Sequence, residues 1–332
     1  MSYKIIYLTA VVLSVQFVPN AYAGCDSCYL PRVNRDSSYS LGADREGFFV
    51  DFRYEYQDWK TQSTEGNEHA EPDDEQSEGE HHDEKSMTPI SGDAESGDHG
   101  HNRSMERFYH FNAGVNISDS FSLLAHIPFV ERFDKRDSSI ENSNGFGDTN
   151  IIGNWRFLRR EEGFVGALLG VKFPTGSTTE RDSEGMRFEP ELQPGTGSTD
   201  VTVGLNYQYK SEKLIFRGNA LHIFRSEGAQ DYQFGDASSF SLFIDTPLQE
   251  SRELSSYVGL DTNLQYGEKD TQFDETVISS GGTILFVGPN LTVKFSDNAL
   301  VSAAVLFPVV QERGGDHQDL SAVYTTGIRV FF

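Results

Sequence analysis

The sequence predicts an all-β chain that folds as a transmembrane, up-and-down antiparallel β-barrel of about 12 strands, within a range of roughly 10 to 14. Three observations predict this class. Apolar and polar residues alternate in about a dozen runs, the links between the runs alternate between long and short, and the final run ends on Phe332. Beyond the N-terminus no stretch approaches the ~18 apolar residues that a membrane helix needs. The chain is therefore expected to cross the membrane with strands.

Residues 1–23 have the pattern of a signal peptide. Lys4 precedes an apolar run over residues 5–18, and Ala21 and Ala23 supply the small residues that a signal peptidase requires. The mature chain is expected to begin at Gly24 and to be exported. A membrane protein that is exported and built of strands belongs in the outer membrane of a Gram-negative cell.

The two cysteines, Cys25 and Cys28, directly follow the expected cleavage site, within a periplasmic segment over residues 24–46. In an exported chain, such a pair predicts a small local disulfide; a redox pair or a soft-metal site is the alternative. Haem attachment would require His where Tyr29 stands. A lipoprotein modified at Cys25 would require an aliphatic residue where Tyr22 stands.

The barrel is expected to span residues 47–332. In its first strand Phe48, Val50 and Phe52 alternate with Asp51 and Arg53, which is the period of two of a strand between unlike environments. The phrase Gly288-Pro289-Asn290 interrupts one run, so that either a bulge lies there or the count is wrong. The expected strands are 47–59, 105–118, 121–132, 146–158, 164–174, 198–210, 213–225, 237–247, 254–267, 277–295, 299–312 and 319–332.

The links between these runs are sorted by parity. Outer-membrane barrels have short periplasmic turns at one end and longer external loops at the other. With an even strand count, both termini then lie on the short-turn, periplasmic side. The expected long links are 59–105, 132–146, 174–198, 225–237, 267–277 and 312–319.

Several phrases resemble a family of bacterial outer-membrane proteins labelled as transporters, or as the meta-pathway of phenol degradation. The resemblance covers most of residues 47–332 and implies an outer-membrane barrel that passes small or hydrophobic molecules. It assigns no role to individual residues, and the cysteine pair and the link after Trp59 depart from it. The phrases are Gly145-Phe146-Gly147-Asp148, Phe173-Pro174-Thr175-Gly176 and Gln193-Pro194-Gly195-Thr196-Gly197-Ser198.

The link over residues 60–103 is the strongest local anomaly. It holds thirteen acidic residues between Thr61 and Gly100 against the single Lys85, and such a composition cannot form a core. Carboxylates and imidazoles are ligands for zinc, copper or nickel, so the link is a candidate metal collector or gate. A solvated, charged external loop is the alternative. Its candidate ligands are His69, His81, His82, His99 and His101.

Polar residues of inward parity predict the lining of a lumen, because a charge facing lipid costs about 2 to 4 kcal/mol at midplane. They could form a selective ring of charge or structural ion pairs across a narrow interior. The candidate pore-lining residues are Asp51, Arg53, Glu55, His110, Asn112, Arg156, Lys172, Arg217 and Asp261, with Asn150, Asn206 and Asn263 on the same parity.

The composition narrows the classes of function. A net charge of -24 argues against a nucleic-acid partner, and no lipase elbow, zinc-protease or phosphate-loop motif indicates an enzyme. The predicted function is an outer-membrane channel or transporter for a small solute, with lipid and solute as partners and no required cofactor. The alternatives are a metal-handling or electron-transfer accessory barrel and a structural or adhesive surface barrel. The oligomeric state is left open.

Overall fold

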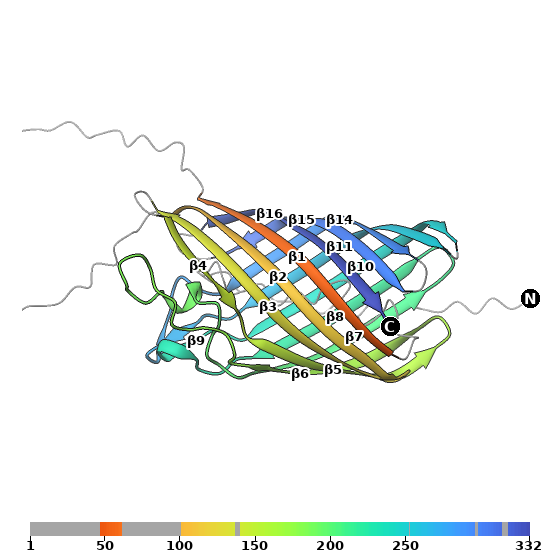
Figure 1. The fold of residues 1–332 in the computed structure, drawn as a ribbon, viewed down its shortest axis with the longest axis horizontal. Helices are drawn as coiled ribbons and strands as arrows, with labels where there is room; N and C mark the ends of the chain where they lie inside the picture. The colour runs from red at the N-terminus through yellow and green to blue at the C-terminus, as the bar shows by residue number, and fades with distance from the viewer. Residues whose placement is uncertain (1–46, 62–100, 137–139, 252, 296–297, 314–317) are drawn as a thin grey trace, which may run out of the picture.

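The computed structural model describes residues 47–61, 101–136, 140–251, 253–295, 298–313 and 318–332. Within these residues the chain forms a closed antiparallel barrel of twelve strands. The first strand, β1, pairs with both β2 and the last strand, β16, and each of the other wall strands pairs with the wall strands that precede and follow it in sequence. Figure 1 shows the strands tilted across the barrel wall. The predicted fold class is confirmed. No helix in the described part of the chain is long and apolar enough to span a membrane.

The wall strands follow the predicted order. They are β1 Gly47–Thr61, β2 His101–Ser118, β3 Phe121–Arg136, β4 Ile140–Phe146 with β5 Thr149–Arg160, β6 Gly163–Phe173, β7 Asp200–Lys210, β8 Ile215–Phe224, β10 Ala237–Glu250, β11 Leu254–Gly267, β14 Gly282–Phe295, β15 Ala299–Glu312 and β16 Gln318–Phe331. Strands β1 to β3, β4 together with β5, and β10 are longer than predicted, whereas β7, β8 and β14 are shorter.

Strands β4 and β5 together form one wall strand. Both pair with β3, and the chain bends between them at Gly147 and Asp148, where Gly147 donates to the carbonyl oxygen of Pro128. The prediction of a long loop over residues 132–146 was wrong, because β3 and β4 extend the wall through most of that stretch. The extension carries polar residues on both faces, such as Asn142, Ser143 and Asn144, and therefore lacks the alternation that marks a strand inside a membrane.

The barrel has two unlike ends. The short links and both described chain ends lie at one, which we call the turn end, where the Phe332 amide donates to the Phe48 carbonyl at 2.8 Å. The links 174–199, 225–236 and 268–281 lie at the other, the loop end (Figure 1). The predicted sorting of links by parity is thus present, apart from the tight link after β3.

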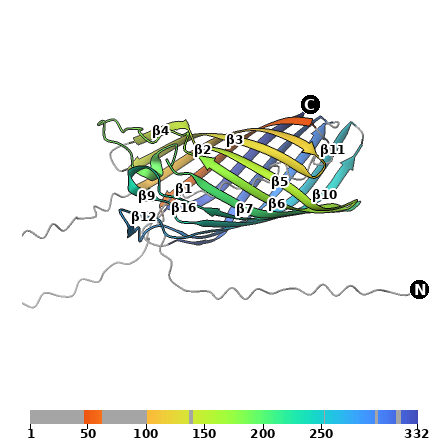
Figure 2. The same ribbon diagram turned by 90° about the horizontal axis from the view of Figure 1, so that it is seen from below.

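Short elements order the loop end. They are η1 Pro190–Leu192, η2 Ala229–Asp231, β9 Tyr232–Gln233, β12 Thr271–Gln272 and β13 Glu275–Thr276. The last three form a separate small sheet that lies at the mouth of the barrel (Figure 2). Two of the links are therefore folded against each other.

The Gly288-Pro289 phrase lies inside a single strand, β14. Pairing with β11 is continuous through it, whereas the register with β15 lacks partners at both residues. Proline has no amide hydrogen to donate. A Cβ on Gly288 would lie 1.8 Å from the Val305 carbonyl oxygen, so glycine allows this close approach. The bulge falls between Leu285 and Phe286 instead, and the count of twelve holds.

The outer face of the wall is apolar and the inner face is layered. Exposed apolar side chains include Phe48, Phe111, Trp155, Leu205 and Ile328, which is the surface that lipid requires. Inside, an apolar cluster at the turn end contains Phe49, Leu124, Leu300 and Phe331. A second cluster toward the loop end contains Trp59, Phe286, Leu306, Leu320 and Val323.

A bulge between Asp58 and Trp59 explains why Leu320 and Val323, which differ in parity, lie on the same face of the closing strand. Asp58 pairs with Ala322 and Trp59 with Leu320, so Ser321 is the extra residue. A bulge reverses the side-chain parity beyond it. Leu320 and Val323 consequently both face inward and pack against Trp59.

Candidate luminal site

The nine candidate pore-lining residues all lie on the inner face of the wall. Asn112 and Lys172 are half-buried there, and the other seven are buried. The alternation in the sequence therefore predicted which face of the wall these side chains lie on. Their role in lining a pore stays a prediction. The buried seven are Asp51, Arg53, Glu55, His110, Arg156, Arg217 and Asp261.

Asp51 organises the charges across the seam between the first and last strands. Arg329 Nη2 donates to one carboxylate oxygen of Asp51 at 3.1 Å, and Asn112 Nδ2 donates to the other at 2.7 Å. Arg53 lies 3.9 Å from the same carboxylate. Sequence reasoning missed Arg329 as a lining residue, although its place on the polar face of the closing strand was a signal that could have found it.

Two further candidates are held by partners on neighbouring strands. Arg217 Nη2 on β8 forms a buried ion pair with Asp245 on β10, and Asn290 Nδ2 on β14 donates to Asp261 on β11. Gln57 Nε2 donates to Glu55 within β1 at 2.7 Å. Asp245 was not predicted, although it shares the inward parity of its strand. These contacts support the structural ion pairs that were expected as one of two alternatives.

Arg156 lies at the turn end. Its Nε donates to the Asp119 carbonyl at 2.7 Å and its Nη2 to the Ser118 carbonyl at 3.0 Å. The guanidinium therefore caps the link between β2 and β3, a task that buries it almost completely. Among the candidates it has the clearest structural role.

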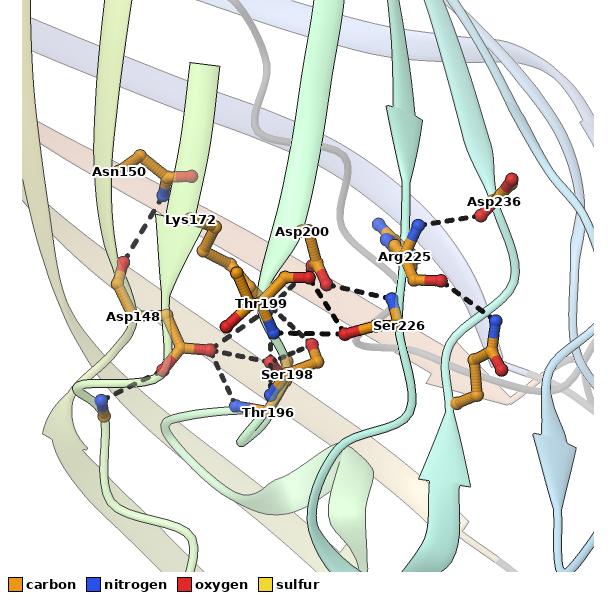
Figure 3. Close-up of polar contacts among 12 residues, drawn as sticks. Asp148, Asn150, Lys172, Thr196, Ser198, Thr199, Asp200, Arg225, Ser226 and Asp236 are labelled. Carbon is orange, nitrogen blue, oxygen red and sulfur yellow. Dashed lines mark hydrogen bonds and ion pairs between the residues drawn. The ribbon is translucent and has the colours of Figure 1, made fainter.

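The link 174–199 folds over the mouth at the loop end, where it covers a cavity of the inner wall. Asp148 anchors the link (Figure 3). One carboxylate oxygen of Asp148 accepts from the Gly176 amide at 2.9 Å. The other accepts from the amide of Thr196 at 2.9 Å and from its hydroxyl at 2.7 Å. The backbones of Gly176 and Gly195 meet closely, since a Cβ on Gly195 would lie 2.6 Å from Gly176 Cα. The bend between β4 and β5 thus places the residue that holds the link.

Lys172 lies between two carboxylates in the same network (Figure 3). Its Nζ is 2.6 Å from Asp200 and 3.3 Å from Asp148, and it also donates to the hydroxyls of Thr196 and Ser198. The ammonium is therefore matched by opposite charge and by hydroxyl acceptors. The family-like phrase over residues 193–198 supplies much of this network, which gives that phrase a structural function.

Gln193 makes the folded link rigid. Its Nε2 donates to the carbonyls of Phe188 at 2.9 Å and Glu180 at 3.1 Å, and its Oε1 accepts from the Glu180 amide at 2.9 Å. Arg132 on β3 donates to the Gln193 carbonyl at 2.8 Å. The link is thus bound to β3 as well as to Lys172 on β6.

A cavity of about 150 Å³ lies between this link and the inner wall. Pro190, Gln193 and Pro194 of the link line one side, and side chains of both polar and apolar type line the wall. His110 Nδ1 and His126 Nε2 meet at 2.9 Å beside it. Because one nitrogen must donate and the other accept, the two rings cannot both be fully protonated in this geometry.

The small sheet at the mouth is fixed by Asp270. Its carboxylate accepts from the Gly235 amide at 2.7 Å and from the Tyr232 hydroxyl at 2.6 Å, and its amide donates to Ser280 Oγ at 2.6 Å. The same Tyr232 hydroxyl lies 2.7 Å from Glu191 of the link 174–199. The links at the mouth therefore share one network.

The predicted metal and cysteine sites stay predictions. Cys25, Cys28, His69, His81, His82 and His99 lie outside the described residues, and β2 begins at His101, so the link after β1 is shorter than predicted. Within the described ranges, no group of three or more His, Cys, Asp or Glu side chains could hold a metal ion.

No protein-family model and no curated protein sequence matches the chain. Its structure is similar to an outer membrane channel from Pseudomonas putida F1, with a TM-score of 0.58 and 13% identity over 87% of this chain and 96% of that chain. It is also similar to the beta domain of the Bordetella autotransporter Brka, with a TM-score of 0.50 and 5% identity over 86% and 100% of the two chains. At such identities the likeness shows the fold, which is that of outer-membrane β-barrels.

Proposed function

We propose that the chain is an outer-membrane channel that passes a small solute through the cavity beneath the link 174–199. The observation that carries this proposal is a charged and polar inner wall that leads to a cavity at the mouth of a membrane barrel. A barrel of twelve strands lies between those that side chains fill and those that hold an open channel. The similarity to an outer membrane channel supports the same function.

The proposed orientation puts the turn end in the periplasm and the loop end outside the cell. Short turns at the periplasmic side are the rule for bacterial barrels, and the expected signal peptide leads the chain there. Solute would then meet the cavity first and the inner ion pairs afterwards. The family label of phenol degradation, and hydrophobic solutes with it, remain a prediction from the resemblance.

Conductance in planar lipid bilayers tests the proposal. The refolded full-length mature chain should produce discrete current steps in potassium chloride. Asp148→Asn should increase their size, because it loosens the link that partly covers the mouth. The control is Asp119→Asn, which changes an exposed carboxylate at the turn end. Correctly folded protein that never conducts would overturn the proposal.

The acidic link over residues 60–103 carries a second proposal, based on its composition of carboxylates and imidazoles. We infer that it collects zinc, copper or nickel outside the cell, or gates the channel. Zinc binding by the purified barrel, followed by calorimetry, should disappear when residues 62–100 are deleted. Equal binding by both proteins would remove the link from consideration.

A further inference from the structure

One wall of the barrel carries a row of uncharged polar side chains in register across neighbouring strands. Register pairs Gly166 on β6 with Asn206 on β7, Asn206 with Asn219 on β8, Asn219 with Ser241 on β10, and Ser241 with Asn263 on β11. Asn154 on β5 meets the start of the row at Gly166. We call Asn154, Asn206, Asn219, Ser241 and Asn263 the carboxamide row. Its neutral composition contrasts with the ion pairs around Asp51.

Two members of the row are buried without hydrogen-bond partners. Asn154 and Asn206 are 0% and 3% exposed, and neither the oxygen nor the nitrogen of either carboxamide has a partner among the described residues. Buried polar groups are normally paired, at a cost of about 1 to 3 kcal/mol when they are not. A pair of unpaired carboxamides side by side indicates a ligand that completes them.

The two carboxamides converge over Gly166. A Cβ at that position would lie 2.3 Å from Asn206 Oδ1 and 2.7 Å from Asn154 Oδ1, so both oxygens occupy the space that a side chain would fill. Gln208 Oε1, the next inward position along β7, is also buried without a partner. Three neighbouring side chains in this part of the wall thus carry buried polar atoms without partners among the described residues.

The donor and acceptor pattern selects the class of ligand. A monovalent cation would satisfy the oxygens and leave both nitrogens unpaired, and an anion would do the reverse. A hydroxyl group donates and accepts, so it satisfies both halves of a carboxamide. At the other end of the row a carboxamide already binds hydroxyl groups of the chain itself. Asn263 Nδ2 donates to the hydroxyls of Ser239 and Ser241 at 2.9 and 2.8 Å.

The row continues the path from the cavity. Thr202 lines the cavity on β7, and Asn206 follows four residues later on the same face, about 13 Å along the strand. We propose that the carboxamide row is a binding subsite for neutral hydroxylated solutes such as sugars or polyols. This proposal rests on the proposed channel function and names the class of its solute.

Saturation-transfer NMR on the folded barrel in detergent, with glucose as the probe, tests the row without requiring transport. Glucose should bind saturably, and the double variant Asn154→Leu with Asn206→Leu should weaken binding at least about tenfold. The matched control is Asn144→Leu, which removes an exposed carboxamide on β4. If the double variant fails to fold, glucose binding is measured on Gly166→Ala in its place, because the added methyl group would displace both carboxamides.

The outcomes separate the two proposals. Absence of glucose binding to a barrel that conducts ions, or equal binding by all variants, would overturn the hydroxyl subsite and leave the channel standing. Glucose binding that is lost when potassium chloride replaces choline chloride at equal ionic strength would assign the row to a cation instead. Saturable, variant-sensitive binding by a barrel that does not conduct would support the row and overturn the channel.

Discussion

At the scale of single residues, Lys172 has the most specific electrostatic position. It lies between Asp148 and Asp200, both of which are buried. Lys172→Met keeps most of the length of the side chain and leaves two carboxylates without their cation, which should cost about 3 to 5 kcal/mol. The measurement is the free energy of unfolding in urea, with the barrel in lipid vesicles. The triple variant with Asp148→Asn and Asp200→Asn should recover part of the loss; no recovery would show that packing, not charge, is responsible.

A substitution at Gly288 tests why the pairing between β14 and β15 is interrupted. Our interpretation is that the two backbones approach closely at Gly288, in addition to the missing amide hydrogen of Pro289. Gly288→Ala would place a methyl group against the Val305 carbonyl and should destabilise the barrel by about 1 to 3 kcal/mol. Gly153→Ala is the matched control, because its methyl group would meet its nearest neighbour at an ordinary 3.5 Å. Equal urea midpoints for the two variants would contradict the interpretation.

The alternation of polar and apolar residues along a strand predicts which face a side chain lies on, but it does not predict which residue that side chain contacts. The period of two placed Asp51, Arg217 and Asp261 on the inner face, because lipid excludes charge from the other. It could not give the partner of any of them, since Asp51 meets Arg329 across 278 residues of sequence. Pairing depends on register, and register is fixed by bulges such as the one at Ser321, which no local pattern of polarity indicates.

At the scale of elements, the link 174–199 is the part most open to experiment. Asp148→Asn removes a carboxylate that accepts three hydrogen bonds from the link, so the link should detach more often. Trypsin should then cleave at the exposed Arg181 and Arg187 at least about tenfold faster than in the unaltered chain. Cleavage sites are read by mass spectrometry.

The control for this experiment lies at the other end of the barrel. Asp119→Asn alters an exposed ion pair with Arg159 and should leave the cleavage rate unchanged. A link that is cleaved equally fast in both variants would not be anchored by Asp148. Slower cleavage in Asp148→Asn would contradict the assigned role even more directly.

Elements inside the membrane were predictable because lipid imposes a pattern on them, whereas elements beyond it were not. The hairpin of β3 and β4 was mistaken for a loop, since its exposed outer face carries Asn142 and Asn144 where a membrane strand would need apolar residues. The folding of residues 174–199 into the mouth was also not predicted. The residues that anchor it, Gly176, Gly195 and Thr196, belong to two of the phrases that resemble a family, and nothing in the sequence indicated their structural role.

At the scale of the whole molecule, the described interior carries more negative than positive charge. Nine buried carboxylates face four buried arginines, and the partly buried Lys172, Arg132 and Arg225 at the cavity do not close the difference. Low-dielectric walls strengthen the field of such an excess and raise the local concentration of counter-ions. A channel with this interior should prefer cations.

The reversal potential across a gradient of potassium chloride measures that preference. It should have the sign of cation selectivity and should decrease as salt rises toward about 1 M, where the Debye length falls to about 3 Å. Asp134→Asn preserves an acceptor for Ser104 while removing one interior charge, so it should shift the potential toward zero. Asp119→Asn removes an equal charge from the outer rim of the turn end and should shift it much less. A potential of the opposite sign, or equal shifts from the two variants, would show that the buried carboxylates do not govern which ions pass.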